Sequence, residues 1–557
     1  MASGTPRTLP QILRDAARKT PGKPALRSKR RGVWQATDLR GYFEAAVETA
    51  LALRADGVVP GDTVLVFAFN GPEWLMADMG IQIAGGRSAG LYPDMAPDER
   101  LEILAALAPS VVFCCGHEQV DQVLAAEASG CLPGLRRIVF WEPAGLQSCT
   151  DPRLVAYDAF RAAAAEQGNR TGMVEAIDAL DPEAVAALCL TRGVTGRVRT
   201  VPLTHADLVA AGKRAVAGVE AGPNGCCLAY LPLANAMARQ CSATLSLMTG
   251  EELVFAEAEQ GLFSAMQTIQ PQSVALFPNG WAELVSQLTV RLEQSPKLPS
   301  RLRLRALRDP QAGRARRVFG AGMRRFMGLA RNSSAICLGG LPDQETRSIL
   351  ERLGIRLHYG YGLTETGGLT HMSQQPQSLL DAPLPGVTVT TDEGGQIHIT
   401  TGPRGGIATG DQRCAAAVRL GQIDRQSDRH GGYGHPVGLG GLESLLTDSR
   451  WIRRAAACPG PDGVTLMIEI DPVTTARWAA ERKLAFTDFA SLVARPELRE
   501  LIDADIAQRL SGLDGTVRIA GHHLLDGPLD LERGELAPVY GLRRARVAER
   551  LVLAQEG

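Results

Sequence analysis

Apolar residues in the first part of the chain recur at two spacings, one typical of buried strands and one typical of helices that cover them. Short apolar runs at 61–70, 111–115 and 137–141 are bounded by turn residues, which favours buried strands. Residues 8–20 and 71–86 instead carry apolar side chains at helical spacing. Strands that alternate with helices predict a parallel sheet with helices on its faces, so we expect an α/β fold.

This alternation continues to about residue 360, and the pattern changes further along. Further strand candidates lie at 187–191, 226–233, 251–256, 273–278 and 334–340. Residues 386–400 show glycine-broken β alternation, and 401–441 are rich in glycine. Strands and helices then return in mixed order, with strand candidates at 465–471 and 516–525. We expect a large N-terminal body of parallel and mixed sheets at 1–424, and a small, mobile α+β domain at 425–557.

Composition narrows the class of protein. The 557 residues are 45% hydrophobic and 21% charged, which is typical of a globular chain and excludes a fully disordered one. The net charge of -1 excludes a chain-wide surface for nucleic acid, so we expect no nucleic-acid partner. No apolar run reaches ~18 residues, and the first residues do not resemble a signal peptide. We expect a cytoplasmic protein.

Cysteine and histidine spacing predicts that the chain has no zinc site. The 11 cysteines are scattered and include no C-x-x-C, which favours reduced, mostly buried thiols. The nine histidines show no zinc-binding spacing.

The one local charge anomaly is the arginine-rich segment 299–331. It carries ten arginines and a single acid, Asp309, with apolar residues between them. One interpretation is a surface for phosphate, CoA or an anionic membrane, that is, a peripheral membrane contact. The other, which we favour, is a solvated helix face over the core, because runs of charge usually face water.

The string from His358 to Gly368 combines residue types that suit a nucleotide. Tyr361 offers a ring for stacking on a base, and Gly362 permits close approach of the backbone. Thr364 offers a hydroxyl to a phosphate, and Glu365 an oxygen ligand to Mg²⁺. A Gly-Tyr-Gly alone also fits a strand-to-loop turn, but the whole string is much more specific.

With this string, the chain resembles the adenylate-forming superfamily, and within it the AMP-forming long-chain fatty acyl-CoA synthetases. Stretches that match the family in order lie at 21–39, 57–93, 230–239, 277–284, 338–342, 358–368, 382–387, 408–411 and 535–544. The resemblance implies that ATP activates a carboxylic acid to acyl-AMP, and that CoA then takes the acyl group as a thioester. It therefore implies ATP/AMP, Mg²⁺ and CoA as cofactors and a carboxylic acid or acyl ligand as partner, and it leaves the oligomeric state open.

The resemblance also assigns roles to individual residues. The phosphate loop would use Thr191, Gly193, Thr195 and Gly196. Adenine would be held by Gly339, Gly340, Leu341, Pro342, Tyr361 and Gly362. Catalytic roles would fall to Thr364, Glu365 (which would also bind Mg²⁺) and Arg425. Asp411 would bind the ribose with Arg425 as its partner, and Asp428 sits at the family's interdomain hinge.

Several positions depart from the family pattern. In the phosphate loop, Arg192 replaces a serine and Val194 a threonine, so two hydroxyls are lost. The family's C-terminal lysine, which would neutralise charge during adenylation, falls on Gly541. The stretch that ends at Asp411 is abridged and lacks the family's tryptophan, and Asn235 replaces a histidine.

Three functions are compatible with this mixture, and an interaction scaffold that binds no nucleotide is a fourth possibility. The first is a working acyl-CoA synthetase with unusual motifs. The second is a non-catalytic protein of the same fold that binds an acyl or nucleotide ligand or a protein partner. The third is an enzyme that performs one half-reaction, such as thioester formation from a supplied acyl-adenylate.

Overall fold

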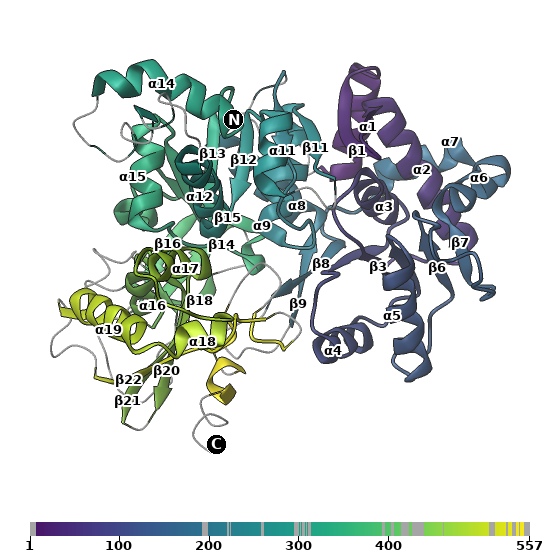
Figure 1. Ribbon diagram of the computed structural model, residues 1–557. Coiled ribbons are helices and arrows are strands. Elements are labelled where there is room, and N and C mark those ends of the chain that lie inside the picture. The colour runs from purple at the N-terminus through teal and green to yellow at the C-terminus, as the bar shows by residue number, and fades with distance from the viewer. Residues whose placement is uncertain are drawn as a thin grey trace.

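The computed structural model has four β-sheets with helices packed around them (Figure 1). It describes residues 7–550 apart from 192–198, 220–221, 223, 258–260, 295–299, 301, 304–306, 308, 310–312, 393–395, 403–405, 414–422, 426–438, 461, 512–517, 531–532, 537–541 and 545. The predicted α/β class is confirmed, because mostly parallel sheets alternate with helices along the chain.

Sheet A has eight strands in the order β15-β14-β13-β12-β10-β11-β1-β2. All neighbours from β14 to β1 are parallel, and the two outermost pairs are antiparallel. The strands are β1 (Pro24–Arg30), β2 (Val33–Asp38), β10 (Cys226–Leu228), β11 (Glu252–Phe255), β12 (Ser273–Leu276), β13 (Ser334–Leu338), β14 (Leu357–Leu363) and β15 (Gly368–Ser373). Since parallel strands end at the same edge, the segments after β10, β12 and β13 meet there.

Sheet B has seven strands in the order β7-β6-β5-β3-β4-β8-β9, all parallel except β9. The strands are β3 (Thr63–Phe67), β4 (Arg87–Leu91), β5 (Val111–Cys114), β6 (Arg137–Phe140), β7 (Leu154–Ala156), β8 (Val185–Thr191) and β9 (Arg199–Thr204). In Figure 1, sheet A runs from the centre, where β12 to β15 are labelled, to β1 at the upper right, and sheet B lies below and to the right of it, from β9 to β7.

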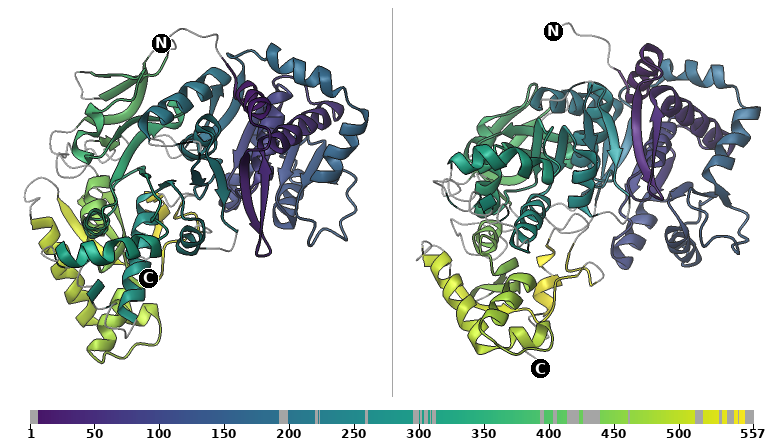
Figure 2. Two further views of the ribbon diagram at one scale, coloured as in Figure 1. Left: turned by 90° about the horizontal axis from the view of Figure 1, so that it is seen from above. Right: turned by 45° about the horizontal axis from the view of Figure 1, so that its top comes forward.

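Two smaller sheets follow in the sequence. Sheet C is antiparallel and contains β16 (Thr388–Thr391), β17 (Gln396–Thr400), β18 (Ile407–Arg413) and β19 (Ile423–Arg425). Sheet D contains β20 (Ile452–Gly460), β21 (Gly463–Ile470) and β22 (Ile519–Leu524). We call the described part of residues 439–550 the C-terminal module. Both views of Figure 2 show it beside the teal and green part of the chain.

Helices alternate with the strands along the chain. In the first 360 residues they are α1 (Leu9–Lys19), α2 (Leu39–Ala55), α3 (Pro72–Ile83), α4 (Pro97–Leu107), α5 (His117–Ala128), α6 (Tyr157–Gln167), α7 (Arg170–Ala176), α8 (His205–Gly218), α9 (Ala236–Arg239), α10 (Leu245–Thr249), α11 (Leu262–Ile269), α12 (Pro278–Gln294), α14 (Gly313–Phe326) and α15 (Gln344–Arg352). The module adds α16 (Leu439–Thr447), α17 (Pro472–Glu481), α18 (Phe489–Val493) and α19 (Pro496–Leu510). Short turns of other helix types are η1 (Ile177–Ala179), η2 (Gln240–Thr244), η3 (Thr364–Thr366) and η4 (Pro376–Asp381).

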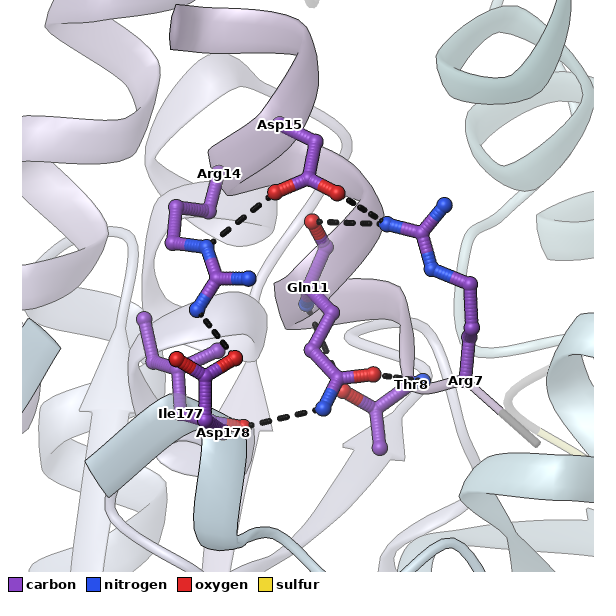
Figure 3. Close-up of polar contacts among 7 residues, drawn as sticks. All are labelled: Arg7, Thr8, Gln11, Arg14, Asp15, Ile177 and Asp178. Atoms are coloured by element: carbon purple, nitrogen blue, oxygen red, sulfur yellow. Dashed lines mark hydrogen bonds and ion pairs between the residues drawn. The ribbon is translucent and has the colours of Figure 1, made fainter. Parts of the chain in front are cut away.

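Helix α1 shows how local sequence sets an element and its place. Thr8 caps the helix by accepting from the Gln11 backbone N–H at 3.3 Å, and the Gln11 side chain accepts from the Thr8 N–H at 3.0 Å. The Gln11 amide also donates to the Ile177 carbonyl at 3.2 Å, and Arg14 donates to Asp178 at 2.6 Å (Figure 3). These contacts hold α1 against η1, which lies more than 160 residues further along the chain.

The body and the module have separate hydrophobic cores. The largest cluster joins both large sheets, since Val66 of β3 and Leu253 of β11 belong to it together with residues of α2 and α3. A separate cluster inside the module is built on β20, β21 and the helices α16 to α19. No helix among the described residues has the length and apolar character needed to span a membrane.

Candidate functional site

The loop after β13 lies at the carboxyl edge of sheet A and depends on two glycines. Gly339 has a φ of 74° and Gly340 a φ of 156°, a region that side-chain-bearing residues rarely adopt. A Cβ at Gly339 would lie 3.5 Å from the Phe277 ring, and one at Gly340 would lie 3.3 Å from Pro278. The loop 339–342 therefore rests on the residues that follow the neighbouring strand β12. Leu341 is half-buried and Pro342 buried.

Tyr361 lies at the same edge, on β14. It pairs with His371 on β15, and the two ring centroids are 5.6 Å apart at 54°. The ring of Tyr361 also packs against a small cluster formed by Leu380, Ile397 and Ile399. The base-stacking candidate is thus half-buried and supported from the sheet C side.

Gly362 is required by its neighbours in the sheet. A Cβ at this position would lie 2.0 Å from the carbonyl oxygen of Gly368, so no side chain fits. The close backbone approach expected at Gly362 is thus made to β15.

The segment with the two proposed phosphate and metal ligands forms η3. Thr364 is half-buried and Glu365 exposed, whereas Thr366 is buried and its hydroxyl accepts from the Leu363 N–H at 3.2 Å. The turn η3 contacts both β8 and β9. Thr191 of β8 pairs with Arg199 of β9, and the loop between them contains the proposed phosphate ligands. The structure therefore brings residues 364–366 against the two strands that precede and follow residues 192–198.

Some of the expected site residues lie outside the described part of the chain. These are Gly193, Thr195 and Gly196, the substituted positions Arg192 and Val194, the hinge residue Asp428, and Gly541. Asp411 and Arg425 are directly paired across β18 and β19, so their backbones are neighbours.

Three polar residues that the sequence did not single out bind backbone groups of the segments that form the site. Arg214 on α8 is 5% exposed and donates to the Thr366 carbonyl at 2.5 Å and to the Leu369 carbonyl at 3.0 Å. Burial lowers the pKa of its guanidinium to about 10. Gln240 accepts from the Leu369 N–H, so it braces the start of β15 as well. No sequence motif marks either residue, because both act on backbone groups far along the chain.

Asn70, which follows β3 of sheet B, is the third of these polar residues. Its amide donates to the carbonyls of Ala229 at 3.0 Å and Leu231 at 2.8 Å, and its oxygen accepts from the Leu233 N–H at 2.9 Å. These bonds fix the segment after β10 and tie the edges of the two large sheets together. The substituted Asn235 caps α9, since its oxygen accepts from the Met237 and Ala238 N–H groups at 3.0 Å.

The described residues do not form a metal-binding cluster at the site. The described residues contain no group of three His, Cys, Asp or Glu side chains placed to hold a metal ion. A single carboxylate such as that of Glu365 is enough for a Mg²⁺ ion that arrives with a nucleotide, because Mg²⁺ usually takes one or two carboxylates, phosphate oxygens and waters.

The arginines near the C-terminus are engaged elsewhere. Arg544 donates to both oxygens of Glu443, at 2.6 Å and 2.7 Å. Arg543 forms an ion pair with Glu99 of α4. Within the arginine-rich segment, Arg324 donates to the Leu353 carbonyl at 2.7 Å, so part of this segment serves to attach α14 to the body.

Comparison with solved structures first identifies the class of fold. The adenylation domain of a carboxylate reductase from Mycobacterium chelonae superposes with a TM-score of 0.73 at 17% identity and covers 100% of this chain and 91% of its own. The adenylation domain of the Segniliparus rugosus carboxylic acid reductase, solved with AMP and a co-purified carboxylic acid, gives 0.72 at 15% identity, covering 100% and 95%. The fold is therefore that of adenylate-forming enzymes.

Sequence comparison then gives the family. The family model described as AMP-binding enzyme matches residues 13–407, and the chain belongs to this family. Long-chain-fatty-acid–CoA ligase ACSBG1 of Bos taurus is 24% identical over 402 residues, which cover 67% of this chain and 54% of the relative. The ligase heimdall of Drosophila melanogaster is 24% identical over 408 residues, covering 68% and 59%. The chain thus spans little more than half the length of these relatives, and the family match ends before Asp411.

Proposed function

We propose that this protein uses ATP to activate a carboxylic acid as acyl-AMP and transfers the acyl group to CoA, with a weakened first step. One observation carries the proposal: loop 339–342 and Tyr361 lie at the carboxyl edge of sheet A, and η3, which directly follows β14, packs on β8 and β9 of sheet B. Ligands of open parallel sheets bind at this edge. The fold and the family match agree with nucleotide chemistry there.

In the first step, a carboxylate oxygen of the acid attacks the α-phosphorus of ATP, and the bond from that phosphorus to pyrophosphate breaks. Tyr361 would stack on adenine against loop 339–342, and Asp411 would accept from the ribose hydroxyls. Thr364 would donate to a phosphate oxygen. Glu365 would hold Mg²⁺, which neutralises phosphate charge when it is bound. These contacts orient the α-phosphorus toward the acid.

In the second step, the sulfur of CoA attacks the acyl carbon and loses its proton, and AMP leaves with the bonding electron pair. We propose a long-chain fatty acid as the acyl donor, since the curated relatives are named long-chain-fatty-acid–CoA ligases. The solved structures that share the fold include enzymes for aromatic acids, such as an anthranilate CoA ligase with anthranoyl-AMP. A panel of both acid classes therefore belongs in any assay.

The first step is the weak one. Gly541 supplies no cation where the family has a lysine, and Val194 supplies no hydroxyl to the phosphate loop. The arginines nearest to Gly541 in sequence, Arg543 and Arg544, are held in ion pairs with Glu99 and Glu443. A lost electrostatic contact to the transition state commonly lowers a rate by roughly 10²–10³-fold.

The engagement of both arginines also favours a second candidate, a nucleotide-binding protein without adenylation activity. A single series of assays separates the candidates. Pyrophosphate exchange with a panel of fatty and aromatic acids measures the first step, and CoA thioester formation from supplied acyl-AMP measures the second. AMP binding by calorimetry measures the site itself. Binding without either reaction supports the second candidate, thioester formation alone indicates a half-reaction enzyme, and no AMP binding contradicts both proposals.

A further inference from the structure

An ion pair between described residues connects the C-terminal module to sheet B. Arg543 pairs with Glu99, which lies 444 residues earlier in the chain. The Arg543 side chain is 16% exposed and the Glu99 side chain 11%, so most of the pair is shielded from water. Exposed pairs contribute little because solvent screens them, whereas removing one member of a buried pair leaves an uncompensated charge.

The module holds Arg543 in a fixed position. Its backbone N–H donates to the Glu535 carbonyl at 2.9 Å, and its carbonyl accepts from the Val547 N–H at 3.0 Å. The adjacent Arg544 is clamped by Glu443, which also accepts from the Ala457 N–H at 2.8 Å. The two arginines therefore have separate tasks: Arg544 anchors the segment to the module, and Arg543 extends from it to the body.

The body holds Glu99 equally well. Glu99 lies in the first turn of α4, where a carboxylate is stabilised by the helix dipole. Helix α4 follows β4, so Glu99 belongs to the carboxyl side of sheet B. The neighbouring Asp98 shares this first turn but is exposed.

Two other polar contacts attach the module to helices that pack on sheet A. Asp448 accepts from the Gln344 N–H at 3.0 Å at the start of α15, and Arg477 pairs with Glu293 of α12. Helix α15 begins directly after the loop that contains Gly339 and Gly340. The module therefore contacts α4, which follows a strand of sheet B, and α12 and α15, which pack on sheet A.

We propose that Glu99 and Arg543 form a positioning pair, which seats the C-terminal module against sheet B. Neither side chain touches the reacting atoms. The effect of the pair on the reaction rests on the proposed function, whereas its effect on module docking does not.

The docking can be tested on the full-length protein by hydrogen–deuterium exchange, which needs no nucleotide. We expect Glu99→Arg and Arg543→Glu each to raise the exchange of amides in 97–107 and 542–550 by roughly tenfold or more, because each reversal places two like charges against one another in a largely buried contact. The exchanged pair, Glu99→Arg with Arg543→Glu, should restore protection. Asp98→Arg is the matched control, since it makes the same charge change in the same helical turn, and it should leave residues 542–550 unaffected. Where a charge reversal prevents folding, Glu99→Gln and Arg543→Gln give the same comparison.

Equal effects of Glu99→Arg and Asp98→Arg, or no restoration by the exchanged pair, would overturn the proposal. Pyrophosphate exchange then tests the consequence: the single variants should lower kcat with little change in the KM for ATP, and the exchanged pair should recover it. Wild-type protein without pyrophosphate exchange counts against the proposed function, while the deuterium exchange result still decides on the pair.

Discussion

Tyr361 and His371 face each other across β14 and β15, with ring centroids 5.6 Å apart. His371 is fully buried, and its Nδ1 lies 2.9 Å from the Thr370 hydroxyl. The hydroxyl of Thr370 in turn donates to the Tyr361 carbonyl at 3.2 Å. The proposed stacking ring therefore has a rigid, buried support behind it, which favours a pre-formed site.

Two substitutions of Tyr361 distinguish the contribution of its ring to AMP binding from that of its hydroxyl. We expect Tyr361→Ala to weaken AMP binding by about 1–3 kcal/mol, the range for stacking of a base on an aromatic side chain, and Tyr361→Phe to retain it. Asp411→Ala should also weaken AMP binding, because a carboxylate that accepts from the ribose is lost. Asp392→Ala is its control, since this exposed residue lies just after β16 of the same sheet. Calorimetry with AMP measures all four variants, and equal affinities would rule out this nucleotide site.

Arg214 should matter for stability. It donates to the carbonyls of Thr366 and Leu369, so Arg214→Leu leaves two buried acceptors without these donors. Each unsatisfied buried group costs about 1–3 kcal/mol, and we expect a loss of unfolding free energy in that range or above. Lys213→Leu is the control, because its side chain is exposed. Urea denaturation measures both variants, and similar midpoints would show that Arg214 does not support η3.

Two buried histidines predict how stability depends on pH. Burial lowers the pKa of His371 and of His205 to about 4. Since an unfolded histidine has a pKa near 6.5, the unfolded chain binds more protons between these values. Above pH ~6.5 both histidines are neutral in the folded and in the unfolded chain, and the free energy of unfolding is not reduced. As the pH falls from there toward 4, each histidine lowers the free energy of unfolding by about 1.4 kcal/mol per pH unit. Urea denaturation at pH 7, 6 and 5 should show this slope, and His371→Gln should reduce it. An unchanged slope in the variant would contradict the burial of a neutral His371.

The domain boundary can be tested by limited proteolysis. The division into 1–424 and 425–557 and the mobility of the second part rest on the glycine-rich composition of 401–441. We expect a non-specific protease to cut first within 401–441 and to release two stable fragments. Early cleavage within 60–115 instead would argue against this boundary.

Much of the α/β body could be predicted from sequence because its strands are short apolar runs. The runs at 61–70, 111–115 and 137–141 contain β3, β5 and β6. Strand β20 gave no such signal, since it contains Arg453 and Arg454 and several alanines. In the sheet its apolar residues are buried, and Arg454 pairs across the sheet with Glu469, which is 1% exposed. A cross-strand pair of this kind is visible only once the register is known.

The sequence singles out candidate site residues where a residue type suits a nucleotide. Tyr361, Glu365 and the two glycines of loop 339–342 form a recognisable string or spacing. Asn70 and Arg214 could not be predicted, because they bind backbone carbonyls of segments about 150 residues away or more. Such contacts depend on the order of strands in the sheets, and the sequence pattern does not determine that order.

Pyrophosphate exchange on the wild-type protein and on Gly541→Lys tests the central claim most directly. The claim is an acid-activating site whose first step is limited by the missing cation, with Val194 as a second defect in the phosphate loop. We therefore expect wild-type exchange above background but well below ~1–10³ s⁻¹, the ordinary range of enzyme turnover. Gly541→Lys should raise it by roughly 10²-fold, and further when combined with Val194→Thr. Wild-type exchange within the ordinary range, or no exchange from any of these proteins, would contradict the account.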